Sequence, residues 1–327
     1  MGRAADRGRR GMMDQTSEVP MTAFAIIGFG EVGGLFARDL HAAVGGGVSR
    51  ITAFDIAESA RARAATTGYV EVRATAAEAA ADADVVFVSV TAGSALDAAA
   101  SLWGGLGHAP FVVDVNSVSP STKREAAHVI EGAGGRYVEA AVMTSVPPHG
   151  LRSPMLLGGP HLREFMALMV PFDMRLTGFS DEIGKASSVK MCRSVMVKGL
   201  EALTTECLLA ARHYGVEREV LRSLADTLPH EDWPGLARYT ISRALLHGKR
   251  RAEEMREVAR TVQEAGVEPL LSRSIAARQD WAGERGREIG KEALATPDLD
   301  ALLDTLAASD RERTLRRYAD AEVEAEL

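Results

Sequence analysis

The sequence predicts an α/β domain with a doubly wound parallel sheet, followed by an all-α C-terminal domain. Three observations lead to this fold class. Short apolar runs alternate with helical patterns from Thr22 to about Thr177, which is typical of a parallel sheet covered by helices on both faces. After about Asp181, only helical periodicity continues. With 327 residues, the chain is also long enough for two ordinary domains.

Strands and helices are predicted to alternate through the first part of the chain. The strands are expected at 23–27, 51–54, 69–72, 85–90, 111–115, 137–142 and 155–157. The clearest helices between them are expected at 31–43, 75–82 and 120–133. Strands that read as continuous apolar residues are buried on both faces, so the helices should lie on both sides of the sheet.

A long helix is predicted to open the second part near Gly184, and the helical pattern then has three breaks. These breaks are rich in turn-forming residues and lie at 227–235, 264–269 and 295–300. We therefore expect a sheet domain over residues 21–182 and a helical domain over residues 183–327. Residues 1–20 are basic, polar and without periodicity, so we expect them to form a disordered N-terminal extension.

Composition and charge argue against two classes of partner. The formal net charge is −7, whereas a protein that binds nucleic acid needs a basic face. No apolar run approaches the roughly 18 residues of a membrane span, so a membrane partner is not expected. Cys192 and Cys207 fall in one predicted helix and are roughly 22 Å apart at about 1.5 Å per residue, too far for a disulfide. We interpret them as core thiols of a cytoplasmic protein, and we expect no metal site.

The first strand runs directly into a glycine-rich loop, "GFGEVG", which opens the next helix. Glycines at this spacing allow a tight turn, close approach to a pyrophosphate and close packing of the helix on the strand. The helix N-terminus adds free N–H groups and a positive dipole, which favour phosphates. We predict that the whole loop binds a dinucleotide cofactor: Gly28, Phe29, Gly30, Glu31, Val32 and Gly33.

Three further strand ends should face the same crevice, because ligands of such sheets bind outside the carboxyl ends of the strands. Asp55 ends the second strand, 22 residues after Gly33. A carboxylate there binds the ribose hydroxyls of NAD and repels the 2′-phosphate of NADP, so NAD is the preferred cofactor. Val90 and Thr91 are also expected to contact the cofactor. Asn116 either contacts nicotinamide or substrate, or caps the helix that begins near Pro120.

The segment "GKASSVKMCRSVMVKGLEAL" (184–203) reads as a buried helix with one lysine inside it. Lys190 shares a helix face with Ser187 and Ser194, and Arg193 lies beside them. A free lysine titrates near ~10.4, but burial and a neighbouring cation would lower its pKa toward ~7–8, which suits proton transfer. On spacing alone, a solvated lysine is the more common reading.

Four blocks together resemble the β-hydroxyacid dehydrogenase family, which includes 6-phosphogluconate and 3-hydroxyisobutyrate dehydrogenases. After the glycine loop come "DVNSVSP" (114–120), "EAAVMTSVPPHGLRSPMLLGG" (139–159) and "GKASSVK" (184–190), in the family's order. The helical half looks most like a subgroup labelled phosphogluconate-dehydrogenase-like. The resemblance implies a Rossmann domain, a helical substrate and dimerisation domain, a homodimer, and NAD or NADP as cofactor. It also implies that Lys190 is the general acid or base when a β-hydroxy acid is oxidised or its carbonyl form reduced.

The same resemblance places the substrate near residues that depart from the family pattern. Met143, Thr144 and Ser145 stand where the family has Ser-Gly-Gly, and Ser194 stands where an asparagine follows the lysine by four. We predict that these four residues bind substrate together with Asn116 and Arg193. The Arg193 guanidinium would clamp a carboxylate, unless it pairs with Glu201 or another acidic residue. Because of these departures, the substrate's identity does not carry over.

The sequence thus predicts an NAD-dependent oxidoreductase that acts on a small, carboxylated β-hydroxy acid or carbonyl compound. Two alternatives remain open: an imine reductase, and a non-catalytic NAD-binding protein that senses redox state or binds a partner. The segment 247–258 mixes positive and negative charges at helical spacing, and we interpret it as a solvated helix face.

Overall fold

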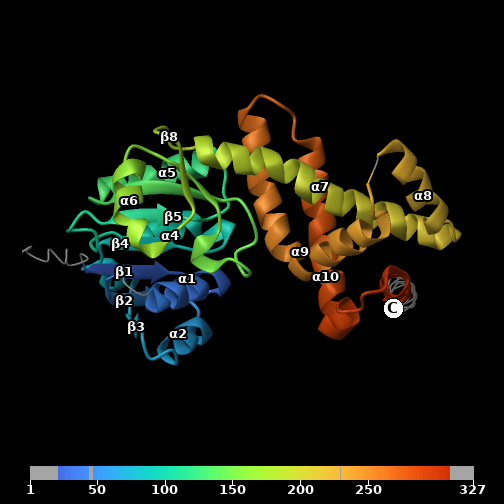
Figure 1. The fold of residues 1–327 in the computed structure, drawn as a ribbon. Coiled ribbons are helices and arrows are strands. Elements are labelled where there is room, and N and C mark those ends of the chain that lie inside the picture. Colours follow the sequence, from blue (N-terminus) through green and yellow to red (C-terminus); the bar gives the residue numbers. More distant parts are fainter. Residues whose placement is uncertain (1–20, 44–46, 229, 310–327) are drawn as a thin grey trace, which may run out of the picture.

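The computed structural model describes residues 21–43, 47–228 and 230–309. It shows an eight-stranded sheet with helices on both faces, followed by a helical half in which long helices project away from the sheet (Figure 1). The predicted fold class is confirmed. The predicted extension over residues 1–20 lies outside the described residues.

The sheet is parallel over six strands and then reverses. The strands are β1 (Thr22–Ile27), β2 (Val48–Phe54), β3 (Glu71–Val72), β4 (Val85–Val88), β5 (Phe111–Asp114), β6 (Arg136–Val142), β7 (Met155–Gly158) and β8 (Leu176–Ser180). Their order in the sheet is β3-β2-β1-β4-β5-β6-β7-β8. β7 runs antiparallel to β6, and β8 runs parallel to β7.

The reversal at β7 corrects the prediction of a wholly parallel sheet. The segment between β6 and β7 contains only the short 3₁₀ helix η2 (Gly150–Arg152) and no α-helix, whereas a parallel connection usually needs a crossover helix. β8 is absent from the predicted strands. Its residues, "LTGFS", are mostly exposed, so they lack the continuous apolar run that identified the other strands.

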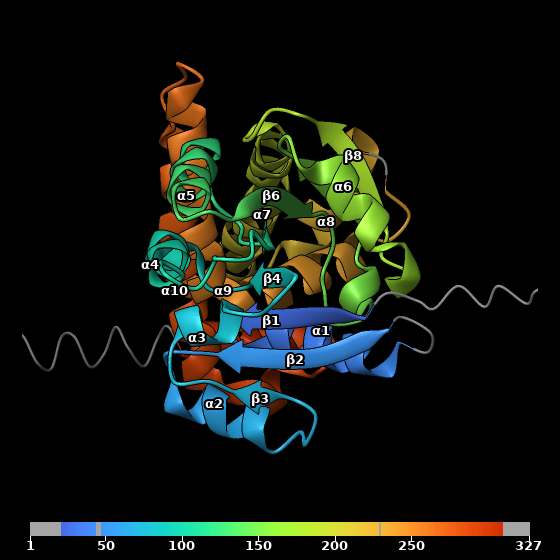
Figure 2. The same cartoon turned by 90° about the vertical axis from the view of Figure 1, so that its left-hand side faces the viewer.

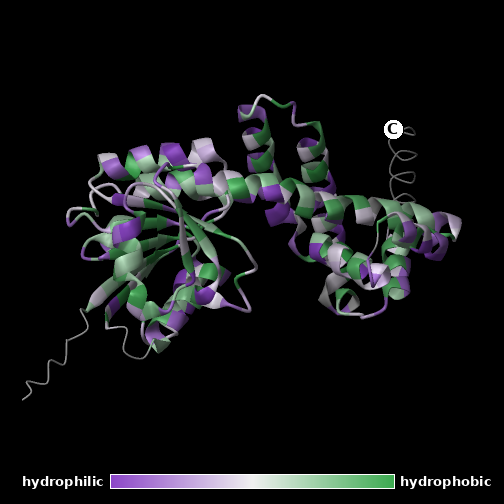
Figure 3. Ribbon diagram, turned by 45° about the horizontal axis from the view of Figure 1, so that its top comes forward, coloured by the Kyte–Doolittle hydropathy of each residue, from purple (hydrophilic) through white to green (hydrophobic). Residues whose placement is uncertain are grey.

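Two cores cover the two faces of the sheet. One core contains side chains of α1 (Glu31–Ala42), α2 (Glu58–Ala65) and α6 (Leu162–Leu168), and the other contains side chains of α3 (Ala76–Ala80), α4 (Ala95–Ser101) and α5 (Pro120–Gly132). Figure 2 shows α4 and α5 on one side of the sheet and α1 and α6 on the other. The strands between them are largely hydrophobic (Figure 3). Two further 3₁₀ helices are η1 (Ala92–Ser94) and η3 (Val170–Phe172).

The helical half is built on α7, which starts against the sheet and continues far beyond it (Figure 1). Its helices are α7 (Lys185–Tyr214), α8 (Glu217–Thr227), α9 (Trp233–Glu264) and α10 (Leu270–Leu294), and residues 299–309 are helical as well. α9 and α10 pack backbone against backbone, since a Cβ atom added to Gly248 would lie 2.4 Å from the Gly283 nitrogen. None of the described helices is long and apolar enough to cross a membrane.

The outward face of α7 corrects two predictions. Met196, Leu200 and Leu203, which read as buried, are exposed. Cys192 and Cys207 are free thiols, as expected, but they are exposed rather than part of the core. All five residues recur at helical spacing on one side of α7, so their apolar character does mark a common face. Nothing in the described part of the chain covers this face.

Candidate active site

The three glycines of the loop between β1 and α1 have different structural roles. Gly28 has a φ of +92°, and a Cβ atom there would lie 2.5 Å from the Ser89 carbonyl oxygen. A Cβ atom on Gly33 would lie 2.1 Å from the Gly28 oxygen, so α1 begins directly against the turn. Around Gly30, in contrast, nothing lies within 4 Å of the added Cβ position. Gly28 and Gly33 are therefore required by the fold, whereas Gly30 borders open space.

The N-terminus of α1 offers free hydrogen-bond donors to that space. The N–H groups of Gly30, Glu31 and Val32 have no acceptor among the described residues. The Phe29 N–H instead donates to Asp55 Oδ2 at 2.7 Å, and the Phe29 side chain is buried in the core. Free N–H groups at the positive end of a helix fit the pyrophosphate of a dinucleotide. Phe29 was predicted to bind the cofactor, but its N–H and its side chain are both used within the protein.

Asp55 lies next to the glycine loop, as a ribose-binding carboxylate requires. Besides the bond from Phe29, its Oδ1 accepts a hydrogen bond from the Ala57 N–H at 2.8 Å, and both oxygens keep a second lone pair. Two arginines also reach this strand end. Arg61 Nη1 donates to the Asp55 carbonyl oxygen at 2.7 Å, and Arg63 Nη2 donates to the Phe29 carbonyl oxygen at 3.3 Å. This strand end therefore carries both a carboxylate, which favours NAD, and two arginine side chains, which favour NADP.

Asn116 joins the ends of β4 and β5. Its Oδ1 accepts a hydrogen bond from the Val90 N–H at 2.8 Å, while its buried Nδ2 has no partner within the described residues. The alternative prediction, that Asn116 caps α5, is wrong, because the Ser119 side chain accepts the bond from the Thr122 N–H. The amide is thus fixed with one donor free, which suits a nicotinamide or substrate oxygen. Thr91, on the neighbouring strand end, is exposed.

A buried network holds the segment that carries Asn116. The Asp114 carboxylate accepts hydrogen bonds from the Asn116 N–H at 2.9 Å and from the Tyr137 hydroxyl at 2.8 Å. It also forms an ion pair with Lys123 Nζ at 2.9 Å. Burial, followed by the charge of Asp114, raises the pKa of Tyr137 well above its usual value of 10.0, so the hydroxyl stays a donor. This network was not predicted from the sequence.

A second buried carboxylate fixes the start of α7. Glu139, on β6, accepts hydrogen bonds from the Gly184 N–H at 2.7 Å and the Ser187 N–H at 2.5 Å. These are orphan donors at the positive end of a helix, where a carboxylate is favoured by the helix dipole and by charge-assisted hydrogen bonds. Lys190 follows one and a half turns later, so the sheet determines where that lysine lies.

Lys190 is only partly exposed, and within the described part of the chain it forms no hydrogen bond or ion pair. Burial lowers its pKa from 10.5 to about 7. Glu254 opposes this shift, while the charges of Lys198, Lys123 and Arg250 reinforce it. Lys123 is the partner of Asp114 at the end of β5, so one of the charges that lower the Lys190 pKa belongs to the strand end that precedes Asn116. A lysine that titrates near neutral pH can both accept and donate a proton there.

The neighbours of Lys190 on α7 are not bonded to it. The Ser187 hydroxyl donates to the Gly184 carbonyl oxygen, and the Ser194 hydroxyl accepts a bond from Lys198 Nζ at 3.1 Å. Arg193 is exposed. Its pairing with Glu201, the alternative to a substrate clamp, is not observed, because Glu201 pairs with Arg251 at 2.8 Å.

The predicted substrate segment faces α9. Met143 follows β6 and is partly buried, whereas Thr144 and Ser145 are exposed. The Ser145 hydroxyl lies 3.4 Å from Arg243 Nη2 on α9. α9 also packs against η1, which follows Thr91 at the end of β4. The helix therefore lies close to both the predicted cofactor site and the predicted substrate segment.

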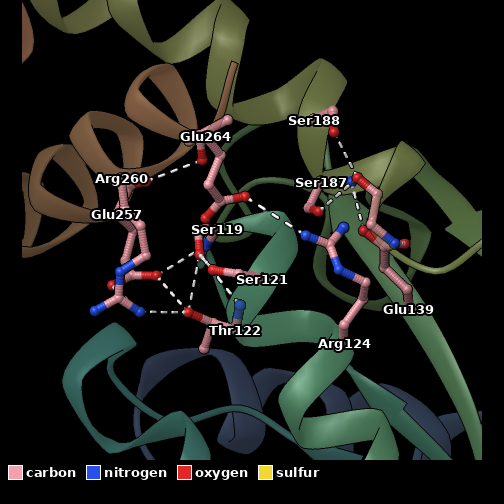
Figure 4. A network of polar contacts seen from close by, with 12 residues as sticks. Ser119, Ser121, Thr122, Arg124, Glu139, Ser187, Ser188, Glu257, Arg260 and Glu264 are labelled. Atoms are coloured by element: carbon pink, nitrogen blue, oxygen red, sulfur yellow. Dashed lines mark hydrogen bonds and ion pairs between the residues drawn. The ribbon is translucent and has the colours of Figure 1, made fainter. Parts of the chain in front are cut away.

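Polar contacts anchor α9 to the sheet half of the molecule. Glu257 accepts hydrogen bonds from the Ser119 N–H at 2.9 Å and the Thr122 hydroxyl at 2.8 Å (Figure 4). Arg260 Nη1 donates to the same Thr122 hydroxyl at 3.0 Å. These contacts join the start of α5 to the C-terminal part of α9. These hydrogen bonds fix the position of α9 relative to the end of β5, which α5 follows.

The charged segment 247–258 of α9 was interpreted wrongly as a solvated face. Arg251 and Glu254 are each only 7% exposed. Glu254 pairs with Lys198 at 3.2 Å and with Arg250 at 2.5 Å. The signal was present in the sequence, since Ala252, Met255, Val258 and Ala259 form an apolar stripe beside these charges.

Two family models match the chain. The NAD binding domain of 6-phosphogluconate dehydrogenase matches residues 23–150, and a domain of unknown function (DUF1932) matches residues 211–282. The first range contains the glycine loop, Asp55 and Asn116. Within the described residues, no group of His, Cys, Asp and Glu side chains could hold a metal ion.

Three solved structures share the fold over most of the chain. A conserved hypothetical protein from Sinorhizobium meliloti 1021 is 34% identical, with a TM-score of 0.66 and coverage of 89% of this chain and 97% of that one. The conserved protein MTH1747, described as similar to 3-hydroxyacid dehydrogenases, is 32% identical, with a TM-score of 0.61 and coverage of 81% and 99%. Mycobacterium tuberculosis 3-hydroxyisobutyrate dehydrogenase is 19% identical, with a TM-score of 0.61 and coverage of 88% and 99%, so its likeness is one of fold.

Proposed function

Because the chain belongs to the 6-phosphogluconate dehydrogenase-like group of the β-hydroxyacid dehydrogenase family, we propose that it is an NAD-dependent oxidoreductase of a small β-hydroxy acid or its carbonyl form. One observation carries the proposal. Lys190 lies on a helix whose start Glu139 fixes to β6, and it has no hydrogen-bond or ion-pair partner within the described residues; burial lowers its pKa to about 7. An unpaired, partly buried lysine with this pKa costs stability, which is a common feature of catalytic groups.

In the proposed reaction, Lys190 transfers the proton and Asn116 orients the reactants. In the oxidation, neutral Lys190 Nζ takes the proton of the substrate hydroxyl, and the carbon–hydrogen bond breaks with its electron pair. NAD, when bound, supplies the acceptor for that hydride. In the reverse direction, protonated Lys190 returns the proton to the carbonyl oxygen. Asn116, held by Asp114 and Val90, orients the nicotinamide or the substrate through its free Nδ2.

We expect NADH to bind more tightly than NADPH, because the Asp55 carboxylate would repel a 2′-phosphate. Replacing Asp55 with serine should narrow the preference for NADH over NADPH by about 5- to 30-fold, since charge repulsion of about 1–2 kcal/mol is lost. Fluorescence titration of purified protein with NADH and NADPH measures both constants. The substitution also removes the acceptor of the Phe29 N–H, so a melting curve is needed to show that the loop remains folded.

Arg61→Ala provides the matched control on the same strand end. If NADPH is bound preferentially by the wild type and this preference disappears in Arg61→Ala, the arginine rather than Asp55 selects the cofactor. If neither nucleotide binds, the proposed function is wrong.

We further propose a homodimer that forms through the apolar face of α7. Leu203 is 67% exposed, and it lies between other exposed apolar residues on the same side of the helix. An exposed apolar stripe of this length usually marks an interface. Leu203→Glu should therefore yield monomers in light-scattering measurements. Val170→Glu adds the same charge at a residue that is 75% exposed on the sheet half, and it should leave the mass unchanged. A monomeric wild type would contradict the proposal.

A further inference from the structure

A row of basic side chains lies on one face of α9, next to the predicted substrate segment. Arg243, His247 and Arg250 occupy positions i, i+4 and i+7, which share a helix face. At one end of the row, Arg243 lies against Ser145. At the other end, Arg250 pairs with Glu254, which also binds Lys198 on α7. The row therefore extends from the predicted substrate segment to the helix that carries Lys190.

Arg243 has hydrogen-bond capacity that the described residues do not use. Its contact to the Ser145 hydroxyl is 3.4 Å, longer than a normal N–H···O bond. Its Nε atom is buried and has no partner in the described part of the chain. A guanidinium carries five donors in a planar fork, and it forms its strongest contacts with carboxylates and phosphates. An unpartnered buried donor costs stability, so a ligand that satisfies it gains affinity.

The charges around the row leave a positive surplus. Glu254 is shared between Lys198 and Arg250, and Glu201 pairs with Arg251. Neither acid is paired with Arg243. The pKa of His247 reflects the surplus, since burial and the charges of Arg243, Arg250 and Arg251 lower it to about 4. His247 is thus neutral at physiological pH, in a chain whose formal net charge is −7.

From this geometry we propose that Arg243 anchors an oxyanion group of the substrate, a carboxylate or a phosphate, with His247 beside it as a hydrogen-bond partner. The proposal rests on the proposed function and names its substrate class. Two helical turns, about 10 Å, separate Arg243 from Arg250, which is the end of the row near Lys190. The anchored oxyanion is therefore a second acidic group of the substrate, beyond the carboxylate that a β-hydroxy acid carries two bonds from its reacting carbon. Arg243, rather than Arg193, sets this specificity.

The test uses malonate and inorganic phosphate as probes, titrated calorimetrically at constant ionic strength into the protein with and without NADH. The wild type should bind at least one probe, and the stronger one identifies the anion class. Arg243→Met should weaken this binding by about 10- to 100-fold, and Arg243→Lys should recover only part of it, because a charge-assisted bidentate contact is lost. Arg163→Met, which removes an exposed arginine far from the row, controls for net charge.

The outcomes separate the anchor from the proposed function. Loss of probe binding in Arg243→Met but not in Arg163→Met supports the anchor, even if NADH does not bind. If NADH binds but neither probe does, the anchor is wrong while the oxidoreductase assignment stands. If Arg193→Met abolishes binding and Arg243→Met does not, the clamp lies on α7 and the anchor is overturned.

Discussion

Replacement of Lys190 by methionine is expected to lower kcat/KM by about 10²–10⁴-fold, because this is what general acid–base catalysis contributes. Methionine keeps the length of the side chain but has no titratable group. NADH affinity should not change, since the glycine loop and Asp55 belong to other elements. The measurement is a steady-state assay with the best substrate from a screen of β-hydroxy acids and semialdehydes, together with an NADH titration of both proteins.

The pH dependence follows from the Lys190 pKa of about 7. In the oxidation the neutral amine is the active form, so kcat/KM should rise with pH and level off above about 7. In the reduction the ammonium is the active form, so kcat/KM should fall above about 7. Both trends should disappear from the residual activity of the Lys190→Met variant.

The same pKa makes a prediction about stability. Below about pH 7 the lysine is protonated in both the folded and the unfolded chain, and the full cost of burying the ammonium is present. Between about pH 7 and 10.5 the unfolded chain binds more protons, so the free energy of unfolding rises with pH. Lys190→Met should therefore be more stable than the wild type at neutral pH, by roughly 1–3 kcal/mol. Denaturant unfolding at pH 7 and 10 tests this.

A matched control separates catalysis from charge. Lys185→Met removes an exposed lysine from the first turn of the same helix and should alter neither activity nor the pH profile. If Lys190→Met keeps full activity, Lys190 is not the proton-transfer group. If no substrate is turned over by the wild type while NADH binds, the non-catalytic alternative gains support. Turnover restricted to imines would favour the reductase alternative.

The cofactor loop could be predicted from the sequence because its signal is local. Gly28, Gly30 and Gly33 follow an apolar strand within six residues, and each spacing has one structural cause. The strand ends that carry Asp55 and Asn116 could be predicted for the same reason, since parallel strands bring their carboxyl ends to one edge. Lys190 was identified through the family resemblance, because helical spacing alone does not distinguish a buried lysine from a solvated one.

The rest of the site depends on contacts between distant segments. Glu139 binds the start of α7 across 45 residues of sequence, and Arg243 reaches Ser145 across 98. Neither pairing leaves a periodic pattern, because only one or two residues on each side take part. The burial of Arg251 and Glu254 is a different case: the apolar stripe beside them is visible in the sequence of α9, but their ion-pair partners lie on α7 and are not.

The second large effect is expected at Gly30, where Gly30→Asp should lower NADH affinity by about 100-fold or more while leaving the fold intact. The space around the Gly30 Cβ position is open, and Gly30 is the N-cap of α1 with an extended backbone. Aspartate is among the best N-cap residues, so the free energy of unfolding should stay the same or rise by about a few tenths of a kcal/mol. Its carboxylate would occupy the free N–H groups and repel the pyrophosphate. At a separation of about 4–5 Å, this charge repulsion costs about 3 kcal/mol or more.

Two further substitutions separate the causes of that loss. Gly30→Asn caps the helix equally well without a charge, so a smaller loss of NADH affinity than in Gly30→Asp measures the electrostatic part. Gly33→Ala should instead destabilise the protein, because its Cβ atom meets the Gly28 oxygen at 2.1 Å and the main chain must move. If Gly30→Asp loses NADH affinity at an unchanged melting temperature, Gly30 serves the cofactor. If Gly33→Ala loses NADH affinity together with a lowered melting temperature, Gly33 serves the fold. Unaltered NADH affinity in Gly30→Asp would mean that the nucleotide does not lie on the N-terminus of α1.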